Sequence, residues 1–296
     1  MVIIGLVFSS CETIIDPKLA DAEPVVVIDA WLDNKSDNQT INLTKSQGYF
    51  DASPLVAING ATVEVLNITT GEVLVFNEQG NSGKYIWTPA APGITIGQIG
   101  DQYKLSVDVN GVGYESTSEM NRVPVIDSIT FNFEPGNAIF PDGYVGECWA
   151  NDLPGKGDAY WIKAWKNDTL LLKPAEINLA YDGGFSDGNN FDGVTFITPK
   201  RRGINPINTD ADGNPLPSYL PGDSVYVEIH SLTKPAFNFL NEVVIQTNRP
   251  GGFSELFAAP VSNVGTNISV SNGTGSKVLG FFNVAAVSVA GKRLRE

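Results

Sequence analysis

Histidine and cysteine are scarce in this chain, which limits the chemistry that it can perform. Its 296 residues include one histidine, His230, and two cysteines. A serine or cysteine nucleophile needs a base, most often histidine, and a zinc site needs several His or Cys ligands at set spacings. Because no zinc spacing, nucleophile elbow or phosphate-binding loop is present either, we expect a protein that is not an enzyme. His230 lies in an alternating segment and is expected to be an ordinary strand residue.

Basic residues are also few, since 19 Lys and Arg stand against 33 Asp and Glu, giving a net charge of -14. Nucleic acids and anionic headgroups attract Lys and Arg patches, so neither is an expected partner. The two basic runs, Lys200-Arg201-Arg202 and Lys292-Arg293-Leu294-Arg295, are short and expected to be solvated. After the N-terminal segment, no stretch is long and apolar enough for a membrane-spanning helix.

The N-terminal apolar run Val2–Ser10 ends at Cys11. A short apolar stretch closed by small residues and a cysteine predicts a bacterial lipoprotein signal over residues 1–11, with Cys11 lipidated. No basic residues precede the run, so we expect the true start to lie upstream. A buried strand is the alternative interpretation. With the signal interpretation, residues 12–24 form a linker to the folded body. The other cysteine, Cys148, is expected to be an inert buried thiol.

Strand patterns dominate the rest of the chain and predict an all-β protein. Most segments alternate polar and apolar residues and are separated by Gly, Asn, Asp and Pro turns. About seven short strands over 25–122 predict an immunoglobulin-like β-sandwich. The alternation stops at Val123-Pro124, and a fresh strand then opens a second β-sandwich domain over 123–290.

The second domain is expected to contain one short helix and one long insertion. Thr233 is a candidate N-cap, Pro235 suits a first helical turn, and apolar residues recur at helical spacing at Ala236, Phe237, Leu240, Val243 and Val244. Residues 181–221 are dense in Gly, Asp, Asn and Pro, which predicts a loop-rich insertion. Binding surfaces are often built on such loops.

An ordered set of segments carries a resemblance to a known family. The chain resembles a family of Bacteroidota outer-membrane lipoproteins known only as a domain of unknown function, of the domain-of-unknown-function 4249 type. The similarity covers nearly the whole chain after the signal, and it rests on these segments: Cys11-Glu12, Val25–Leu32, Gly60–Val63, Gly83–Tyr85, Val123–Ile129 and Val278–Val284.

The resemblance implies a location and a partner. Members are generally encoded beside SusC/SusD-like TonB-dependent uptake systems, which implies a surface-exposed, lipid-anchored accessory in the outer membrane. Such lipoproteins often carry an acidic export signal after the cysteine, whereas only Glu12 and Asp16 stand near Cys11 here, so the side of the membrane that it faces stays open. A surface glycan or peptide hydrolase and a structural or adhesive envelope protein are the alternatives.

No cofactor is expected from the sequence, except that a calcium ion is left open as an alternative. Asp210-Ala211-Asp212-Gly213 resembles the start of a calcium loop, but the later acidic ligand of that loop is missing. An Asp-Gly turn explains the same residues more simply. Asp187 lies in a second acidic loop, and carboxylates from the two loops together would suit a calcium ion.

Aromatic residues supply the candidate ligand or partner contacts. Phe185 and Phe191 lie in the polar insertion, where a core role is hard to assign, and Trp149 is a further candidate. Aromatic rings suit the faces of oligosaccharides and peptides because they offer a large contact area at small entropic cost. Trp161 and Trp165 share the parity of Lys163 and are expected to cover one face of a sheet.

Three short matches to an O-glycosylation motif of Bacteroidota envelope proteins complete the candidate sites. They place the modified hydroxyls at Ser128, Thr169 and Ser224, each preceded by Asp and followed by an aliphatic residue.

Overall fold

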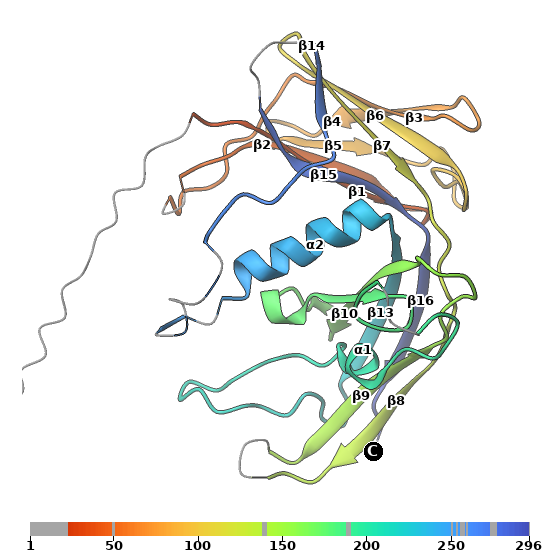
Figure 1. Cartoon of the computed structure of the whole chain (residues 1–296), viewed down its shortest axis with the longest axis vertical. Coiled ribbons are helices and arrows are strands. Elements are labelled where there is room, and N and C mark those ends of the chain that lie inside the picture. The colour runs from red at the N-terminus through yellow and green to blue at the C-terminus, as the bar shows by residue number, and fades with distance from the viewer. Residues whose placement is uncertain are drawn as a thin grey trace, which may run out of the picture.

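The structure is a computed structural model that describes residues 23–48, 51–137, 141–187, 191–249, 251–252, 254, 258, 260–272 and 277–295. It is mostly β, as the alternating pattern predicts, with strands in three sheets and few helices (Figure 1). The prediction that strands dominate the chain is therefore confirmed. Among the described residues, no helix is long and apolar enough to cross a membrane.

The largest sheet has nine strands and draws on both ends of the described chain. Its spatial order is β14 (Ser269–Asn272), β7 (Val112–Glu119), β6 (Gln102–Val109), β3 (Thr62–Asn67), β4 (Val73–Glu78), β5 (Lys84–Trp87), β2 (Gln39–Lys45), β1 (Val26–Asp33) and β15 (Val278–Ala285). The sheet curls so that β15 approaches β7, where Val284 N donates to Ser118 Oγ over 3.0 Å. The result resembles a barrel around one apolar core.

Alternation along each strand explains this core. In β6, every second residue, from Tyr103 to Val109, is buried, while the residues between them are more exposed. The strands of one sheet thus bury one face each, and their buried side chains meet inside the curl. β15 closes the core by pairing in parallel with β1, from Val26 beside Val278 to Asp33 beside Ala285.

A second, five-stranded sheet lies below the first in Figure 1. Its order is β11 (Thr169–Leu170), β10 (Ala159–Lys166), β13 (Ser224–Leu232) and β16 (Val287–Arg293), with β12 (Asn178–Tyr181) also paired to β10. β8 (Ile126–Glu134) and β9 (Gly143–Ala150) form a two-stranded sheet that packs on it. The insertion contributes the short helix α1 (Thr198–Arg202), and a 3₁₀ turn, η1 (Pro174–Glu176), precedes β12.

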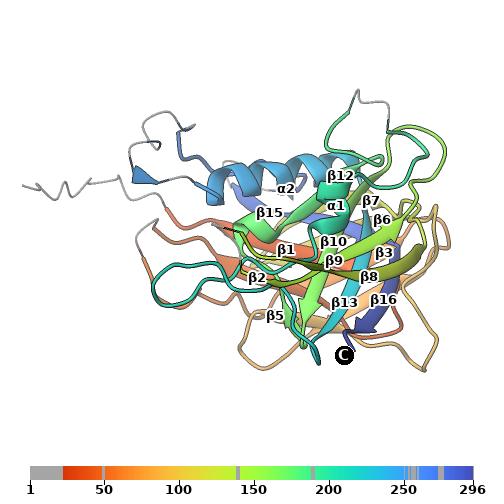
Figure 2. The same cartoon turned by 90° about the horizontal axis from the view of Figure 1, so that it is seen from below.

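Helix α2 (Lys234–Thr247) lies between the two larger sheets in Figure 1 and along one side of them in Figure 2, and it contacts both β10 and β15. Thr233 caps it, since the Thr233 side chain accepts a hydrogen bond from Ala236 N, and Pro235 occupies the first turn. Both features were predicted from the sequence and are confirmed. Its buried residues, Ala236, Phe237 and Leu240, join a third apolar cluster that includes Phe281 of β15.

The division into an immunoglobulin-like first domain and a second sandwich is not confirmed. β14 and β15 come from the predicted second domain, yet they belong to the nine-stranded sheet. Sequence alternation identifies strands but not their partners, because strand pairing is decided by contacts between segments far apart in the chain. Whether residues 25–122 fold independently stays a prediction.

Candidate functional site

One face of the five-stranded sheet points toward the nine-stranded sheet and carries unusual side chains. On β10 and β13 the residues of this face lie side by side in three pairs: Trp161 with His230, Lys163 with Glu228, and Trp165 with Tyr226. The opposite face carries the apolar residues of the second core. The alternation of side chains in a strand therefore gathers rings and charges on a single face.

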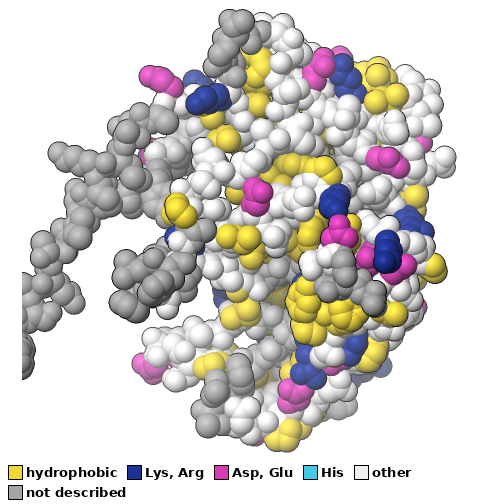
Figure 3. Space-filling view, viewed as in Figure 1, with side chains coloured by type: hydrophobic (Ala, Val, Ile, Leu, Met, Phe, Trp, Pro, Cys, Tyr) yellow, Lys and Arg dark blue, Asp and Glu magenta, His cyan; other side chains and the backbone are white. Residues whose placement is uncertain are grey.

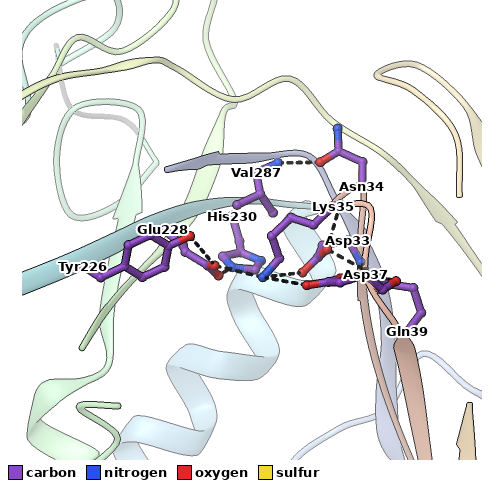
Figure 4. Close-up of polar contacts among 9 residues, drawn as sticks. All are labelled: Asp33, Asn34, Lys35, Asp37, Gln39, Tyr226, Glu228, His230 and Val287. Atoms are coloured by element: carbon purple, nitrogen blue, oxygen red, sulfur yellow. Dashed lines mark hydrogen bonds and ion pairs between the residues drawn. The ribbon is translucent and has the colours of Figure 1, made fainter. Parts of the chain in front are cut away.

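The middle of this face forms an ionic cluster with the turn after β1, buried at Glu228 and His230 and exposed at Asp37. We call Asp33, Lys35, Asp37, Glu228 and His230 the inter-sheet cluster (Figure 4). Lys35 Nζ lies 2.9 Å from Glu228 Oε1, 3.5 Å from Asp33 and 3.9 Å from Asp37. His230 Nε2 lies 2.6 Å from Glu228 Oε2. The cluster thus joins the nine-stranded sheet to the five-stranded sheet.

Glu228 stays ionised in this cluster although it is buried. Burial raises the pKa of a carboxyl, but hydrogen bonds from His230 and Lys35 outweigh it and bring the pKa of Glu228 to about 2. Burial also tends to lower the pKa of Lys35, yet the Glu228 bond and the nearby carboxylates raise it overall. For His230 burial prevails and lowers the pKa. A neutral His230 therefore donates its Nε2 hydrogen to a charged Glu228.

The oxygens of Glu228 are fully engaged. Oε1 accepts from Lys35 and from the Tyr226 hydroxyl at 3.2 Å, and Oε2 accepts from His230. Glu228 is 4% exposed and His230 is 6% exposed. This geometry suits a structural joint between two sheets better than a proton-transfer pair, which would need access to a substrate.

A pair of aromatic rings, one partly buried and one exposed, borders the inter-sheet cluster. Trp165 and Tyr226, which we call the aromatic row, have ring centroids 5.5 Å apart at an angle of 60°. Tyr226 is 39% exposed, and its neighbour on β16 is Gly291, which has no side chain to cover the ring. Farther inside, Trp161 packs edge-on against Trp31 and carries Lys163 Nζ over its ring. The row is therefore the open end of an otherwise covered face.

The predicted aromatic contacts lie elsewhere, and two of them contact side chains of α1. Phe185 is 52% exposed, and Lys200 Nζ lies 4.2 Å from its ring centroid. Trp149 is partly buried, with the Arg201 guanidinium 4.0 Å above its ring and its Nε1 donating to Thr130. Phe191 is partly buried, and its ring lies against Gly184. Phe185 is the most accessible of the three, and the roles of all three stay predictions.

The basic run Lys200-Arg201-Arg202 is not simply solvated, contrary to the expectation. Arg201 and Arg202 both bind the buried carboxylate of Glu147, at 3.2 and 2.8 Å, and burial lowers the pKa of Lys200 to about 8. The short helix α1 turns these side chains inward, where they pair with a charge and with rings.

The acidic residues considered for calcium have separate partners in the described part of the chain. Asp210 accepts hydrogen bonds from the backbone of Asp212 and Asn214 in its own turn, and Asp187 pairs with Lys234 of α2. Within the described residues, no group of three or more His, Cys, Asp or Glu side chains is arranged to hold a metal ion. On the face in Figure 3, acidic side chains lie scattered rather than gathered. Calcium binding stays a prediction.

The remaining predicted positions are placed as follows. Ser128 and Thr169 are exposed, and Ser224 is partly buried and donates to Asn167. Cys148 is buried, as predicted, and burial raises the pKa of its thiol to about 12. Cys11 lies outside the described residues. Glycosylation and lipidation therefore stay predictions.

The inter-sheet cluster is the feature that the sequence analysis missed. A signal existed, because ionisable residues recur with period two in Asp33, Lys35 and Asp37 and again in Glu228 and His230. Charged residues at alternate strand positions normally mark a solvated face, so the pattern predicts exposure. Burial follows here only because the turn after β1 packs across β13, which the sequence does not reveal.

Comparisons with known proteins give one family match. The family described as "Domain of unknown function (DUF4249)" matches residues 12–290. No curated protein matches the chain.

Proposed function

The chain belongs to the DUF4249 family, and from that premise we propose that it is a non-catalytic binding protein of the bacterial outer membrane. In this proposal Cys11 carries the lipid anchor and the body faces the cell exterior. There it serves a SusC/SusD-like TonB-dependent transporter of Bacteroidota as an accessory subunit. An oligosaccharide or a short peptide is the proposed ligand, and no cofactor takes part.

The observation that carries the proposal is the aromatic row beside the inter-sheet cluster. Trp165 and Tyr226 expose ring surface on a rigid sheet, and Gly291 leaves the ring of Tyr226 uncovered. Rigid rings bind sugar or peptide faces with little loss of entropy. Lys35 and Asp37 are both partly accessible next to the row and supply hydrogen-bonding groups for a polar ligand.

The engagement of Glu228 and His230 also favours binding over catalysis. A hydrolase needs an acid or base that reaches the substrate, whereas both side chains are buried and bonded to each other. The insertion adds a second candidate contact at Phe185, whose exposed ring lies under Lys200.

Ligand binding is tested with the aromatic row itself. We expect Trp165→Ala and Tyr226→Ala each to weaken binding by about tenfold or more, the range of a lost aromatic anchor, for whichever oligosaccharide or peptide binds the wild type. Titration calorimetry with neutral oligosaccharides and with defined peptides would measure it.

Phe133→Ala is the matched control, because Phe133 is also exposed but lies on β8. It should bind like the wild type. Equal binding by the two aromatic-row variants and the wild type would show that the row is not the binding site. Turnover of the ligand would show that the protein is a hydrolase instead.

Transporter association is tested by gentle extraction of tagged protein from its native membrane. A SusC/SusD-like transporter should co-purify with the wild type and be lost when Cys11→Ser prevents lipidation. Recovery of a lone monomer from lipidated wild type would contradict the accessory role.

A further inference from the structure

The edge strand β16 leaves a row of backbone groups open. Around β16, Ser231 N donates to Ala286 O at 2.9 Å and Leu294 N donates to Asp223 O at 2.8 Å, so even-numbered residues bond toward β13. In an antiparallel pair the bonding direction alternates. Val289, Gly291 and Arg293 therefore direct N–H and C=O away from the sheet. Within the described part of the chain, no hydrogen bond reaches these outward groups.

A groove borders the last residues of this strand. It is an open depression of about 560 Å³ between Phe131 of β8 and the segment 291–295. Backbone groups of β8 bond to side chains of β16: Ile126 N donates to Ser288 Oγ at 3.1 Å, and Ile129 O accepts from Lys292 Nζ at 2.7 Å. The two strands form no ladder. In Figures 1 and 2, β16 lies at the margin of its sheet, beside β13.

The charge at this edge is opposite to that of the protein. Lys292, Arg293 and Arg295 are exposed, and within the described residues none of them makes an ion pair. The chain as a whole has a net charge of -14. Lysine on an edge strand can simply discourage aggregation. Three cations beside a groove in an acidic protein additionally select an acidic occupant, because charge complementarity favours one partner over others.

We propose that β16 accepts an extended acidic segment of a partner protein as an additional strand. The backbone of the segment would bond to Val289, Gly291 and Arg293. Carboxylates on one face of the segment would lie on the same side as the Arg293 side chain, because successive side chains of a strand point to opposite faces, and Lys292 and Arg295 would add to the positive charge around the segment. This is the β-augmentation mode of peptide recognition, in which main-chain bonds give affinity and side chains give selectivity. The proposal rests on the edge strand alone and does not depend on the aromatic row or the lipid anchor.

A short peptide tests the proposal on the full chain. The probe is a fluorescein-labelled seven-residue peptide of alternating glutamate and valine, followed by fluorescence anisotropy. We expect saturable binding that weakens with salt, and at least about tenfold weaker binding by the lysine–valine counterpart. The triple variant Lys292→Gln, Arg293→Gln, Arg295→Gln should lose the preference for the acidic peptide.

Strand addition is separated from simple charge attraction by removing one outward N–H. Gly291→Pro deletes such a donor and leaves the hydrogen bonds to β13 in place. It should weaken binding of the acidic peptide by about tenfold. Gly291→Ala keeps the donor and is the control. If Gly291→Pro does not fold, methylating alternate backbone nitrogens of the peptide makes the same test on the unaltered protein.

Several results would overturn the proposal. One is absence of binding, and another is equal binding of the acidic and basic peptides. Unchanged affinity after Gly291→Pro or after peptide methylation would show attraction by charge alone. A concentration-dependent dimer that Gly291→Pro dissociates would assign the edge to a second copy of this chain instead.

Discussion

Glu228 shows how one buried charge can hold two sheets together. It is nearly inaccessible, and it receives hydrogen bonds from Lys35 of the turn after β1 and from Tyr226 and His230 of its own strand. Ionised carboxylates are costly to bury unless they are paired and bonded. The pairing at Glu228 therefore ties the position of the β1 turn to the ionisation of this side chain.

Replacing Glu228 tests this joint. We expect Glu228→Gln to lower the free energy of unfolding at pH 7 by about 2 to 3 kcal/mol, since bonds to a buried charge are lost. Glu115→Gln is the control, because Glu115 pairs with Lys104 at the same 2.9 Å separation but on the surface. Exposed pairs contribute only about 0.2 to 1 kcal/mol. Urea unfolding would measure both, and equal losses would contradict a special role for Glu228.

The pH dependence of stability follows from the two shifted groups. The folded pKa of Glu228 is depressed to about 2, so the stability that it contributes is present above the ordinary glutamate pKa and is lost as the pH falls toward 2. Burial also lowers the pKa of His230, so the unfolded state takes up its proton first below about pH 6.5. Both effects weaken the fold in acid, and the wild type should lose more stability than Glu228→Gln between pH 5 and pH 3.

At this scale the sequence predicted individual residues better than their contacts. The Thr233 cap follows from local chemistry within one turn of helix. Lys35 and Glu228 are 193 residues apart, and nothing local to either of them indicates the other. Residue roles that depend on a distant partner therefore escaped prediction.

Strand β15 depends on a glycine where it meets β1. Gly280 has a φ of +95°, and a Cβ added there would overlap the carbonyl oxygen of Ile28. Ile28 is its direct neighbour in the parallel pairing. Only glycine combines this backbone conformation with so close an approach.

Substitution of Gly280 should therefore strongly destabilise the fold. We expect Gly280→Ala to destabilise the protein by about 3 to 4 kcal/mol, combining an unfavourable φ with a steric clash. Gly100→Ala is the matched control, because Gly100 has a similar φ of +92° but open space around it. The Gly100→Ala substitution should cost about 1 to 2 kcal/mol. Thermal unfolding would compare the two, and equal shifts would show that backbone strain alone is responsible.

Helices and strands were predicted better than their pairing, because pairing depends on contacts between segments far apart in the sequence. The strands of the first 120 residues and α2 follow from alternation, turns and capping within each segment. The place of β14 and β15 in the nine-stranded sheet depends on pairing with strands more than 150 residues away. That pairing is why the two-sandwich division is not confirmed.

For the whole molecule, the strands that the two halves of the chain share predict that neither half is stable without the other. The first core includes residues that follow the predicted boundary at 122: Ile268, Val278, Phe282, Val284 and Ala286. Burying a large apolar side chain stabilises by about 1.5 to 3 kcal/mol. The C-terminal contribution is thus on the order of 8 kcal/mol, comparable with the whole net stability of a typical domain.

A fragment of residues 23–122 tests this interdependence. Without β15, it would expose the edge of β1 and the apolar side chains that Phe282 and Val284 cover. We expect the fragment to lack a cooperative urea transition and to bind the dye ANS, whereas the full chain unfolds cooperatively. Co-expression with residues 123–296 is the control, and it should restore the transition because it supplies β14 and β15. A fragment that unfolds cooperatively by itself would instead establish residues 23–122 as an independent domain, and β15 as an addition to a core that is complete without it.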